Sequence, residues 1–343
     1  MKLLYWNKAL AWKEWRQNSL RFWGLFIIMS LTPVFSAIFT LALGALYPEA
    51  WFNGGAYHAN TWSEGIALMV NSGDNWIMRT LVPILIMVLA VLIVAEERSN
   101  NSLEFLLATP VSRREVLSTK FLLGAGVITA IMVFEFLFML GLNICLPAKY
   151  SIGAAGEWFL LTTSVYLAIF ALALLAASIT GNFRTALFAA IIFIYFPRIL
   201  AEILGELFAA FDLYPGMFLI PYRETLAFWA NHLTLPYYLD HYCYGQLNVW
   251  AVLLIILAAI IFYRLAIRFF EHNQQERNGQ ALMLANSAQI LKVGTSILLA
   301  ALSAIILAGI LQIKGWPILL FFVLVYFLVS ALFAFVYRYG DTT

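Results

Sequence analysis

Charged residues are scarce in this sequence. Asp, Glu, Lys and Arg make up only 11% of its 343 residues, whereas 63% are hydrophobic. Soluble domains carry about 25% charged residues, and nucleic-acid binders depend on basic surface patches. The scarcity therefore excludes an ordinary cytosolic enzyme, a disordered chain and a nucleic-acid binder. A mean hydropathy of +0.88 indicates a polytopic membrane protein whose apolar surface is covered by lipid.

Cysteine is almost absent, and so is any phosphate-binding motif. The two cysteines, Cys145 and Cys243, exclude a disulfide framework and a cysteine-rich metal site. They could form one disulfide in an oxidising compartment or remain two buried thiols, and the sequence leaves both alternatives open. No G-x-x-x-x-G-K-[ST] segment occurs, so this chain does not hydrolyse ATP with a phosphate loop. A net charge of +2 names no partner.

Long apolar runs dominate what is present. About 20 mostly apolar residues are needed for a helix to cross the hydrocarbon core. The runs predict an all-α membrane protein with about eight spans, at residues 22–46, 77–95, 121–146, 158–180, 185–207, 248–270, 292–313 and 316–337. The last two form either a full hairpin, which we prefer, or a shallow re-entrant pair.

The basic residues predict the orientation of these spans, because cytosolic loops are enriched in Lys and Arg. With the N-terminus inside, fifteen of the 20 basic residues face the cytosol: Lys2, Lys8, Lys13, Arg16, Arg21, Arg98, Arg113, Arg114, Lys120, Arg184, Arg264, Arg268, Arg277, Lys292 and Arg338. The outer half holds Arg79, Lys149, Arg198, Arg223 and Lys314. We therefore expect both termini in the cytosol. The long charged lead before the first span argues against a cleavable signal peptide.

The segments outside the spans divide the chain. Residues 1–21 mix tryptophans with basic residues, which is typical of an interfacial helix and equally of an ordinary basic flank. Residues 22–270 form a predicted six-span unit, whose outer segment 208–247 is rich in aromatic side chains. A polar cytosolic connector at 271–291 leads to the C-terminal hairpin at 292–343.

A short amphipathic helix is predicted between the second and third spans. Asn101 fits a helix N-cap, with Glu104 three residues later as in a capping box. Leu103, Leu106 and Leu107 follow at the i, i+3, i+4 spacing of one helical face. This leucine face could dock a partner or rest on the inner leaflet.

A proline turn separates this helix from the next. Pro110 ends the short helix, since the residue before proline disfavours the α region. Ser112 and Glu115 then form a second capping box, which predicts the start of the helix that becomes the third span. The whole segment 96–120 is therefore an ordered loop at the cytosolic surface.

One run of residues in this loop carries a family resemblance: Glu96-Glu97-Arg98, Leu103-Glu104, Leu106-Leu107, Thr109-Pro110-Val111, Arg113 and Lys120. The run resembles the cytosolic loop of type 2 ABC exporter permeases, in which a coupling helix seats in a groove of the ATP-binding subunit. The N-terminal segment resembles the family's elbow helix. The similarity is specific over about 25 residues and topological over roughly 1–270; the C-terminal pair departs from the usual six-span unit.

The resemblance implies a function and its partners. The chain would be a non-catalytic permease for a lipophilic or amphipathic substrate, with ATP and Mg bound by two separate ATP-binding subunits and a second permease, identical or related, beside it. It would lie in the plasma membrane of a bacterium and hold no cofactor or metal itself. The implied partner-binding residues are Leu103, Glu104, Leu106, Leu107, Pro110, Arg113 and Arg114. A sensory or scaffolding membrane protein and an ion-coupled secondary transporter are the alternatives.

Glu135, Arg198 and Glu202 are charged residues that lie well inside predicted spans. Glu135 lies 14 residues beyond Phe121 and Arg198 lies 14 residues beyond Arg184, so both are at a depth of roughly 21 Å. They could pair within one chain or across a dimer; Arg198 could instead pair with Glu202 one turn along, and Glu135 could be protonated in an apolar setting. Intramembrane charges mark functional sites by default, so Glu135 is the best candidate for the translocation path.

Two further sites are weaker hypotheses. The Glu96-Glu97 pair is similar to the glutamates of intramembrane CAAX-type proteases, but the arginine and the later histidines of that motif are missing. His232, Asp240 and His241 could ligate a metal, but their spacing matches no ligand pattern. We therefore predict no catalytic and no metal site.

Overall fold

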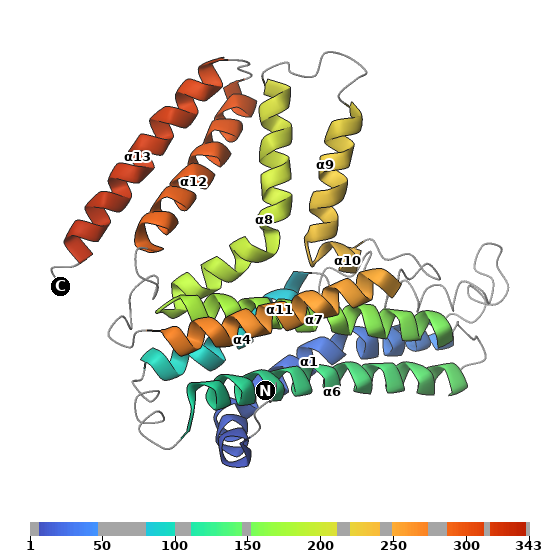
Figure 1. Cartoon of the computed structure of the whole chain (residues 1–343). Coiled ribbons are helices and arrows are strands. Elements are labelled where there is room, and N and C mark those ends of the chain that lie inside the picture. Colours follow the sequence, from blue (N-terminus) through green and yellow to red (C-terminus); the bar gives the residue numbers. More distant parts are fainter. Residues whose placement is uncertain are drawn as a thin grey trace, which may run out of the picture. The chain divides into compact units, whose positions relative to one another are not determined.

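The structure is a computed structural model that describes residues 7–46, 80–99, 111–145, 152–210, 220–240, 249–273, 287–311 and 316–340. Within these ranges every regular element is a helix, which confirms the predicted all-α class (Figure 1). The helices are α1 (Lys8–Leu46), α4 (Val82–Ser99), α6 (Arg113–Cys145), α7 (Ile152–Ile179), α8 (Phe183–Ala210), α9 (Ile220–Leu233), α10 (Tyr237–Asp240), α11 (Val249–His272), α12 (Ser287–Leu311) and α13 (Trp316–Gly340).

Four of these helices are long and apolar enough to cross a membrane. They cover Arg113–Ile144, Ala155–Ile179, Phe183–Gly205 and Val249–His272. Shorter apolar helices occupy Val82–Glu96, Ser296–Leu311 and Trp316–Leu332. With α1 over the first predicted span, each of the eight apolar runs coincides with a helix. The multi-pass architecture is thus confirmed, while eight full crossings stay a prediction.

The chain divides into two compact units. The first comprises residues 1–194 and 235–280, and the second 195–234 and 281–343. The division falls within α8, close to Pro197, which has no backbone N–H to give to the helix. The predicted limits of the six-span unit and the connector lie elsewhere, at 270 and 291, and stay predictions.

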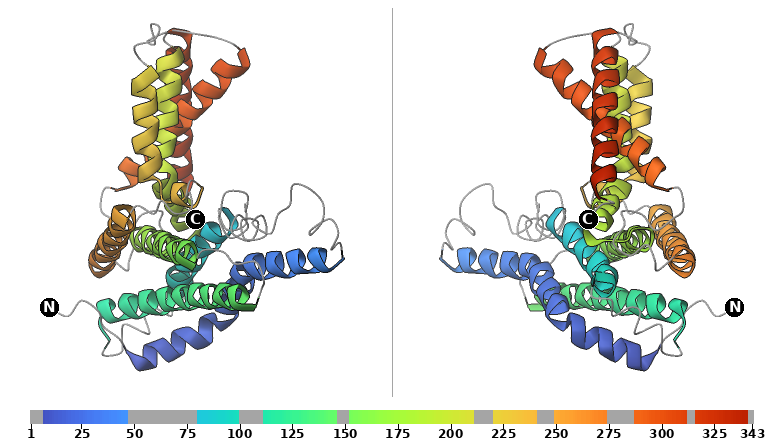
Figure 2. Two further views of the ribbon diagram at one scale, coloured as in Figure 1. Left: turned by 90° about the vertical axis from the view of Figure 1, so that its right-hand side faces the viewer. Right: turned by 90° about the vertical axis from the view of Figure 1, so that its left-hand side faces the viewer.

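Helix α7 is the centre of the first unit. It is largely buried, whereas the other three long apolar helices bury much less of their surface. It packs against α4, α6 and, most extensively, α11, and these helices lie side by side in both figures of the ribbon (Figures 1 and 2). Buried alanines such as Ala168 and Ala171 on α7 and Ala259 and Ala266 on α11 allow this close approach.

An aromatic contact fixes α6 against both α7 and α11. Gly124 of α6 faces Phe170 of α7 so closely that a methyl group added at Gly124 would overlap the ring. The rings of Phe121 and Tyr263 stack with centroids 4.2 Å apart, and the Tyr263 hydroxyl donates to Ser118 Oγ at 3.0 Å. Gly124 is required at the contact between α6 and α7, because a larger residue there would overlap the Phe170 ring.

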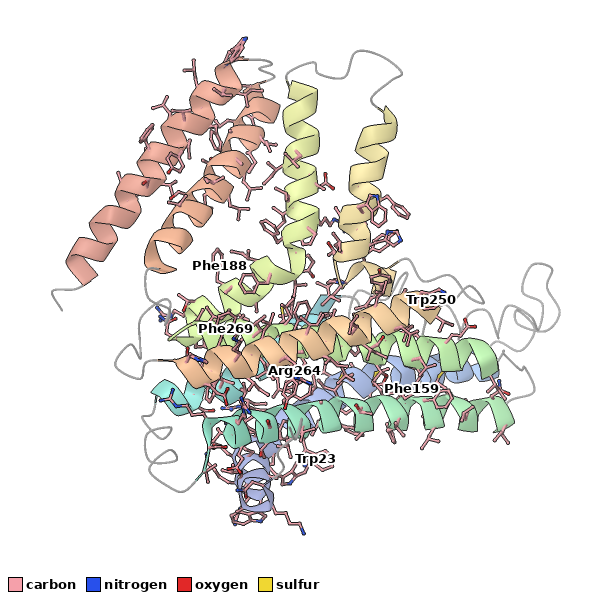
Figure 3. All side chains as sticks on the ribbon, in the orientation of Figure 1. Trp23, Phe159, Phe188, Trp250, Arg264 and Phe269 are labelled. Atoms are coloured by element: carbon pink, nitrogen blue, oxygen red, sulfur yellow. The ribbon has the colours of Figure 1, made fainter. Side chains whose placement is uncertain are left out.

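The second unit contains the C-terminal pair of helices. α12 packs along α13, with Ala300 and Ala304 buried between them. Large apolar side chains such as Leu320, Leu324 and Phe327 of α13 are exposed. In the first unit Trp23 and Trp250 are exposed in the same way (Figure 3). Such outward apolar surfaces are those that lipid would cover.

Candidate functional site

The capping box at the start of α6 is present as predicted. Glu115 N–H donates to Ser112 Oγ at 3.2 Å, and Ser112 N–H donates to a carboxylate oxygen of Glu115 at 3.0 Å. The reciprocal bonds satisfy two backbone donors that the first turn leaves free. The preceding amphipathic helix, with Leu103, Glu104, Leu106, Leu107 and Pro110, lies outside the described residues.

A buried ion pair joins three helices next to that loop. Lys120 Nζ of α6 lies 2.8 Å from Glu14 Oε1 of α1, and both side chains are almost fully buried, at 1% and 2% exposure. The ammonium also donates to the carbonyl of Ile93 in α4 at 2.8 Å. Because a buried charge needs both its partner and its hydrogen bonds, this contact fixes α1, α4 and α6 relative to one another.

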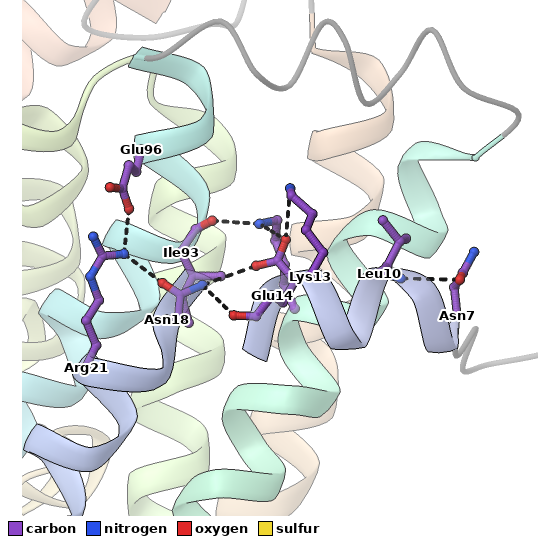
Figure 4. Close-up of polar contacts among 9 residues, drawn as sticks. Asn7, Leu10, Lys13, Glu14, Asn18, Arg21, Ile93 and Glu96 are labelled. Carbon is purple, nitrogen blue, oxygen red and sulfur yellow. Dashed lines mark hydrogen bonds and ion pairs between the residues drawn. The ribbon is translucent and has the colours of Figure 1, made fainter. Parts of the chain in front are cut away.

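The pair continues into a polar row along α1. Asn18 Nδ2 donates to the Glu14 carbonyl at 3.1 Å, and Arg21 donates to Asn18 Oδ1 at 2.7 Å (Figure 4). Arg21 also forms an ion pair at 2.5 Å with Glu96, near the end of α4. The row therefore links α1 to the residue at which the predicted cytosolic loop begins.

Sequence reasoning missed this row, although a signal for it exists. Residues buried on α1 recur at helical spacing: Leu10, Glu14, Asn18, Phe22, Leu25 and Met29. Glu14 and Asn18 thus stand on the apolar face rather than among the basic residues. A polar residue on such a face predicts a buried partner. The predicted interfacial segment also runs into the first span without a break, since both belong to α1.

A second polar cluster, which we call the clasp, joins the start of α6 to the ends of α11 and α7. Arg113 donates to the carbonyls of Glu271 and Asn273 at 3.1 and 2.6 Å. Arg114 forms a two-pronged ion pair with the Glu271 carboxylate. Asn273 Nδ2 donates to the carbonyl of Ser178 at 2.6 Å. Both arginines predicted to face a partner are thus engaged within the chain.

The charged residues in the predicted spans differ in burial. Glu135 of α6 is fully buried, and neither carboxyl oxygen has a hydrogen-bond partner in the described part of the chain. Tyr166, buried on α7, lies within electrostatic range of it. Arg198 and Glu202 are exposed on α8. Within the described residues Glu135 therefore has no ionic partner.

His232 is the one candidate metal ligand whose side chain the structure describes. His232 Nδ1 lies 2.7 Å from the carbonyl of Phe228 one turn earlier, and the two rings are in contact. Among the described residues no group of His, Cys, Asp or Glu could hold a metal ion. The side chains of Cys145 and Asp240, and the whole of His241 and Cys243, lie outside the described residues.

Comparison with known proteins decides the family. The model of the ABC-2 family transporter proteins matches residues 8–336. The chain belongs to the ABC-2 family. This membership identifies a membrane permease of an ABC transporter, a class of typically non-catalytic subunits that work with an ATP-binding partner. The comparison with curated proteins found no match.

ABC-2 membership gives the two polar clusters their context. Glu96 precedes the short amphipathic helix predicted before Pro110, which the family resemblance makes the coupling helix. Arg113, Arg114 and Lys120 follow that helix. All four are tied to other helices: the first and last to α1, and the two arginines to α11. Both ends of the segment are thus anchored in the first unit.

Proposed function

We propose that this ABC-2 permease forms the export path for a lipophilic or amphipathic substrate and is driven by a separate ATP-binding subunit. The family match over residues 8–336 carries the proposal. The chain has no phosphate loop, so ATP and Mg are bound by the partner. The residues proposed to dock it are Leu103, Glu104, Leu106 and Leu107, on the amphipathic helix that the sequence predicts before Pro110.

The anchored ends of this segment support a mechanical role. A force on the docking helix reaches α4 and α6 along the chain. It then passes to α1 through Glu96 and Lys120 and to α11 through Arg113. The Glu14–Lys120 pair is buried and hydrogen-bonded, so it forms a rigid contact. A displacement of α6 therefore moves α1 with it. Hydrolysis in the partner can therefore move the membrane helices.

Purification with an ATP-binding protein tests the proposal. The complex in proteoliposomes should hydrolyse ATP and move lipophilic cations or fluorescent lipids in an ATP-dependent way. A complex that hydrolyses no ATP would favour the sensory or scaffolding alternative. Movement that follows an ion gradient and ignores ATP would favour secondary transport.

We further propose an assembly of two ATP-binding subunits and two permeases, identical or related, in a bacterial plasma membrane. The exposed Trp12 and Trp15, beside Arg16, suit the inner interface, where amphipathic rings and basic side chains anchor helices. The N-terminal part of α1 would then act as the elbow helix.

Topology gives a direct prediction. In a variant without Cys145 and Cys243, Ser112→Cys should react only with thiol reagents on the cytosolic side, because it opens α6 at the predicted inner surface. Ile152→Cys, at the exposed start of α7 between the third and fourth predicted spans, should react only from outside. Labelling in right-side-out and inverted vesicles measures both. Reaction of the two positions from one side would disprove the N-inside orientation.

Glu135 gives a second prediction. If its carboxyl takes part in translocation, Glu135→Gln should preserve the folded yield, because the amide matches it in shape and carries no charge. Turnover by the complex should fall several-fold. ATP hydrolysis and dye movement in proteoliposomes measure this. Glu157→Gln, the same change at a carboxyl just before the fourth predicted span, controls for the substitution itself and should leave turnover unchanged. Normal turnover in Glu135→Gln would remove the residue from the path.

A further inference from the structure

The clasp is built to hold the end of α11. The last carbonyls of a helix have no partner within it, and its C-terminus carries partial negative charge. Arg113 supplies donors to two such carbonyls, those of Glu271 and Asn273, from the first turn of another helix. Arg114 donates a hydrogen bond to the side-chain carboxylate of Glu271. The guanidinium of Arg113 therefore serves as a C-cap for α11, while that of Arg114 holds the Glu271 side chain.

The two polar clusters differ in how far their ion pairs are exposed to water, which decides whether a contact can open. In the clasp, Arg114 and Glu271 have side chains 36% and 26% exposed, so water can replace each partner when they separate. Lys120 and Glu14 are almost wholly buried, and separating them would strand two charges away from water. The Arg114–Glu271 contact can therefore open, whereas the Lys120–Glu14 contact stays closed.

The surroundings of the clasp determine which helices would separate. Asn273, itself buried, keeps the end of α11 on α7 through its bond to the Ser178 carbonyl. Farther along α6, Ser118 and Phe121 stay in contact with Tyr263 of α11. Release of the arginines would therefore free the first turn of α6 from the α7–α11 pair, and the buried contact at Tyr263 would act as the pivot.

We propose that the contacts of Arg113 and Arg114 with the end of α11 open and close in each transport cycle, and that both arginines are positioning residues rather than contacts to the ATP-binding subunit. The inference rests on the proposed function, because the pull on the clasp comes from the docking helix immediately before it. The clasped arrangement is the state in which the end of α11 is capped. The Glu14–Lys120 pair stays closed throughout.

Reversible cross-linking tests this inference. Arg114→Cys and Glu271→Cys are combined in a chain whose Cys145 and Cys243 are serine, and the chain is assembled with its ATP-binding subunit in nanodiscs. A cleavable bifunctional thiol reagent should join the two positions. Cross-linking should lower ATP hydrolysis at least tenfold, and cleavage of the linker should restore it. Trapping with ATP and vanadate should lower the cross-linking yield several-fold.

The controls separate movement from static structure. The pair Arg268→Cys and His272→Cys, exposed and one turn apart on the same end of α11, should cross-link without loss of hydrolysis. Full hydrolysis by the cross-linked 114–271 complex, with a yield independent of nucleotide, would overturn the proposal. If the cysteine-free parent shows no ATP hydrolysis with any partner, the proposed function itself fails and takes this inference with it.

A single substitution provides a second measurement. Arg113→Gln removes the guanidinium from the α11 carbonyls but leaves the predicted docking helix intact. The complex should still assemble, while the stimulation of ATP hydrolysis by the permease falls several-fold. Arg268→Gln, exposed on the same side, should change neither. Loss of assembly in Arg113→Gln, with normal assembly in Arg268→Gln, would place Arg113 at the subunit contact and contradict the clasp.

Discussion

Replacing Lys120 by methionine should cause the largest loss of stability of any single change in the first unit. Among the described cations, the substitution leaves the buried Glu14 carboxylate with only Lys13, 3.5 Å away and one-third exposed, and removes the Lys120 hydrogen bond to the Ile93 carbonyl. Breaking one half of a buried pair typically costs about 3–5 kcal/mol. We expect the monodisperse fraction after heating in detergent to fall sharply, measured by size-exclusion chromatography.

The double variant Glu14→Leu with Lys120→Met distinguishes this cause from loss of packing. It removes both charges and keeps the volume, so most of the lost stability should return. Lys13→Met provides the matched control, because Lys13 is one-third exposed beside the same carboxylate. A double variant no more stable than Lys120→Met would show that the ion pair is not the source of the loss.

Replacing Leu106 by aspartate should abolish coupling. A charge on the predicted apolar face of the docking helix would meet an apolar groove, and an unpaired buried charge is strongly unfavourable. We expect the permease to insert normally, because the segment lies outside the hydrocarbon, while stimulation of ATP hydrolysis is lost. Complex recovery and hydrolysis rate measure the two effects.

Leu106→Met tests whether the apolar character of this position is what matters. Methionine keeps apolar character at similar volume, so coupling should survive. Glu104→Gln on the same segment removes only a charge of the predicted rim and should cost less, with an effect that fades at high salt. Intact assembly and full stimulation in Leu106→Asp would assign the leucine face to the lipid surface instead.

Local patterns predicted the fold well. Apolar runs located helices at all eight positions, since a bilayer demands long uninterrupted hydrophobic segments. The Ser112–Glu115 capping box located the start of α6, because its bonds join residues three apart.

Contacts between distant residues could not be predicted in the same way. Lys120 was treated as part of a basic flank, because nothing near it in the sequence indicates Glu14, 106 positions away. Arg113 and Arg114 were assigned to a partner, because the polar end of α11 lies 157 or more positions further on. Burial and ion pairing depend on which helices pack together, and a single sequence does not contain that information.

The position of α7 has a consequence for biosynthesis. Its most extensive contact is with α11, yet residues 180–248 separate the two helices in the chain. While the chain is being made, α7 enters the membrane with the surface that α11 will cover still exposed to lipid. The first unit is therefore completed late, and incomplete chains present this surface to quality control. A chain that ends before residue 249 would lack the helix that closes its own core.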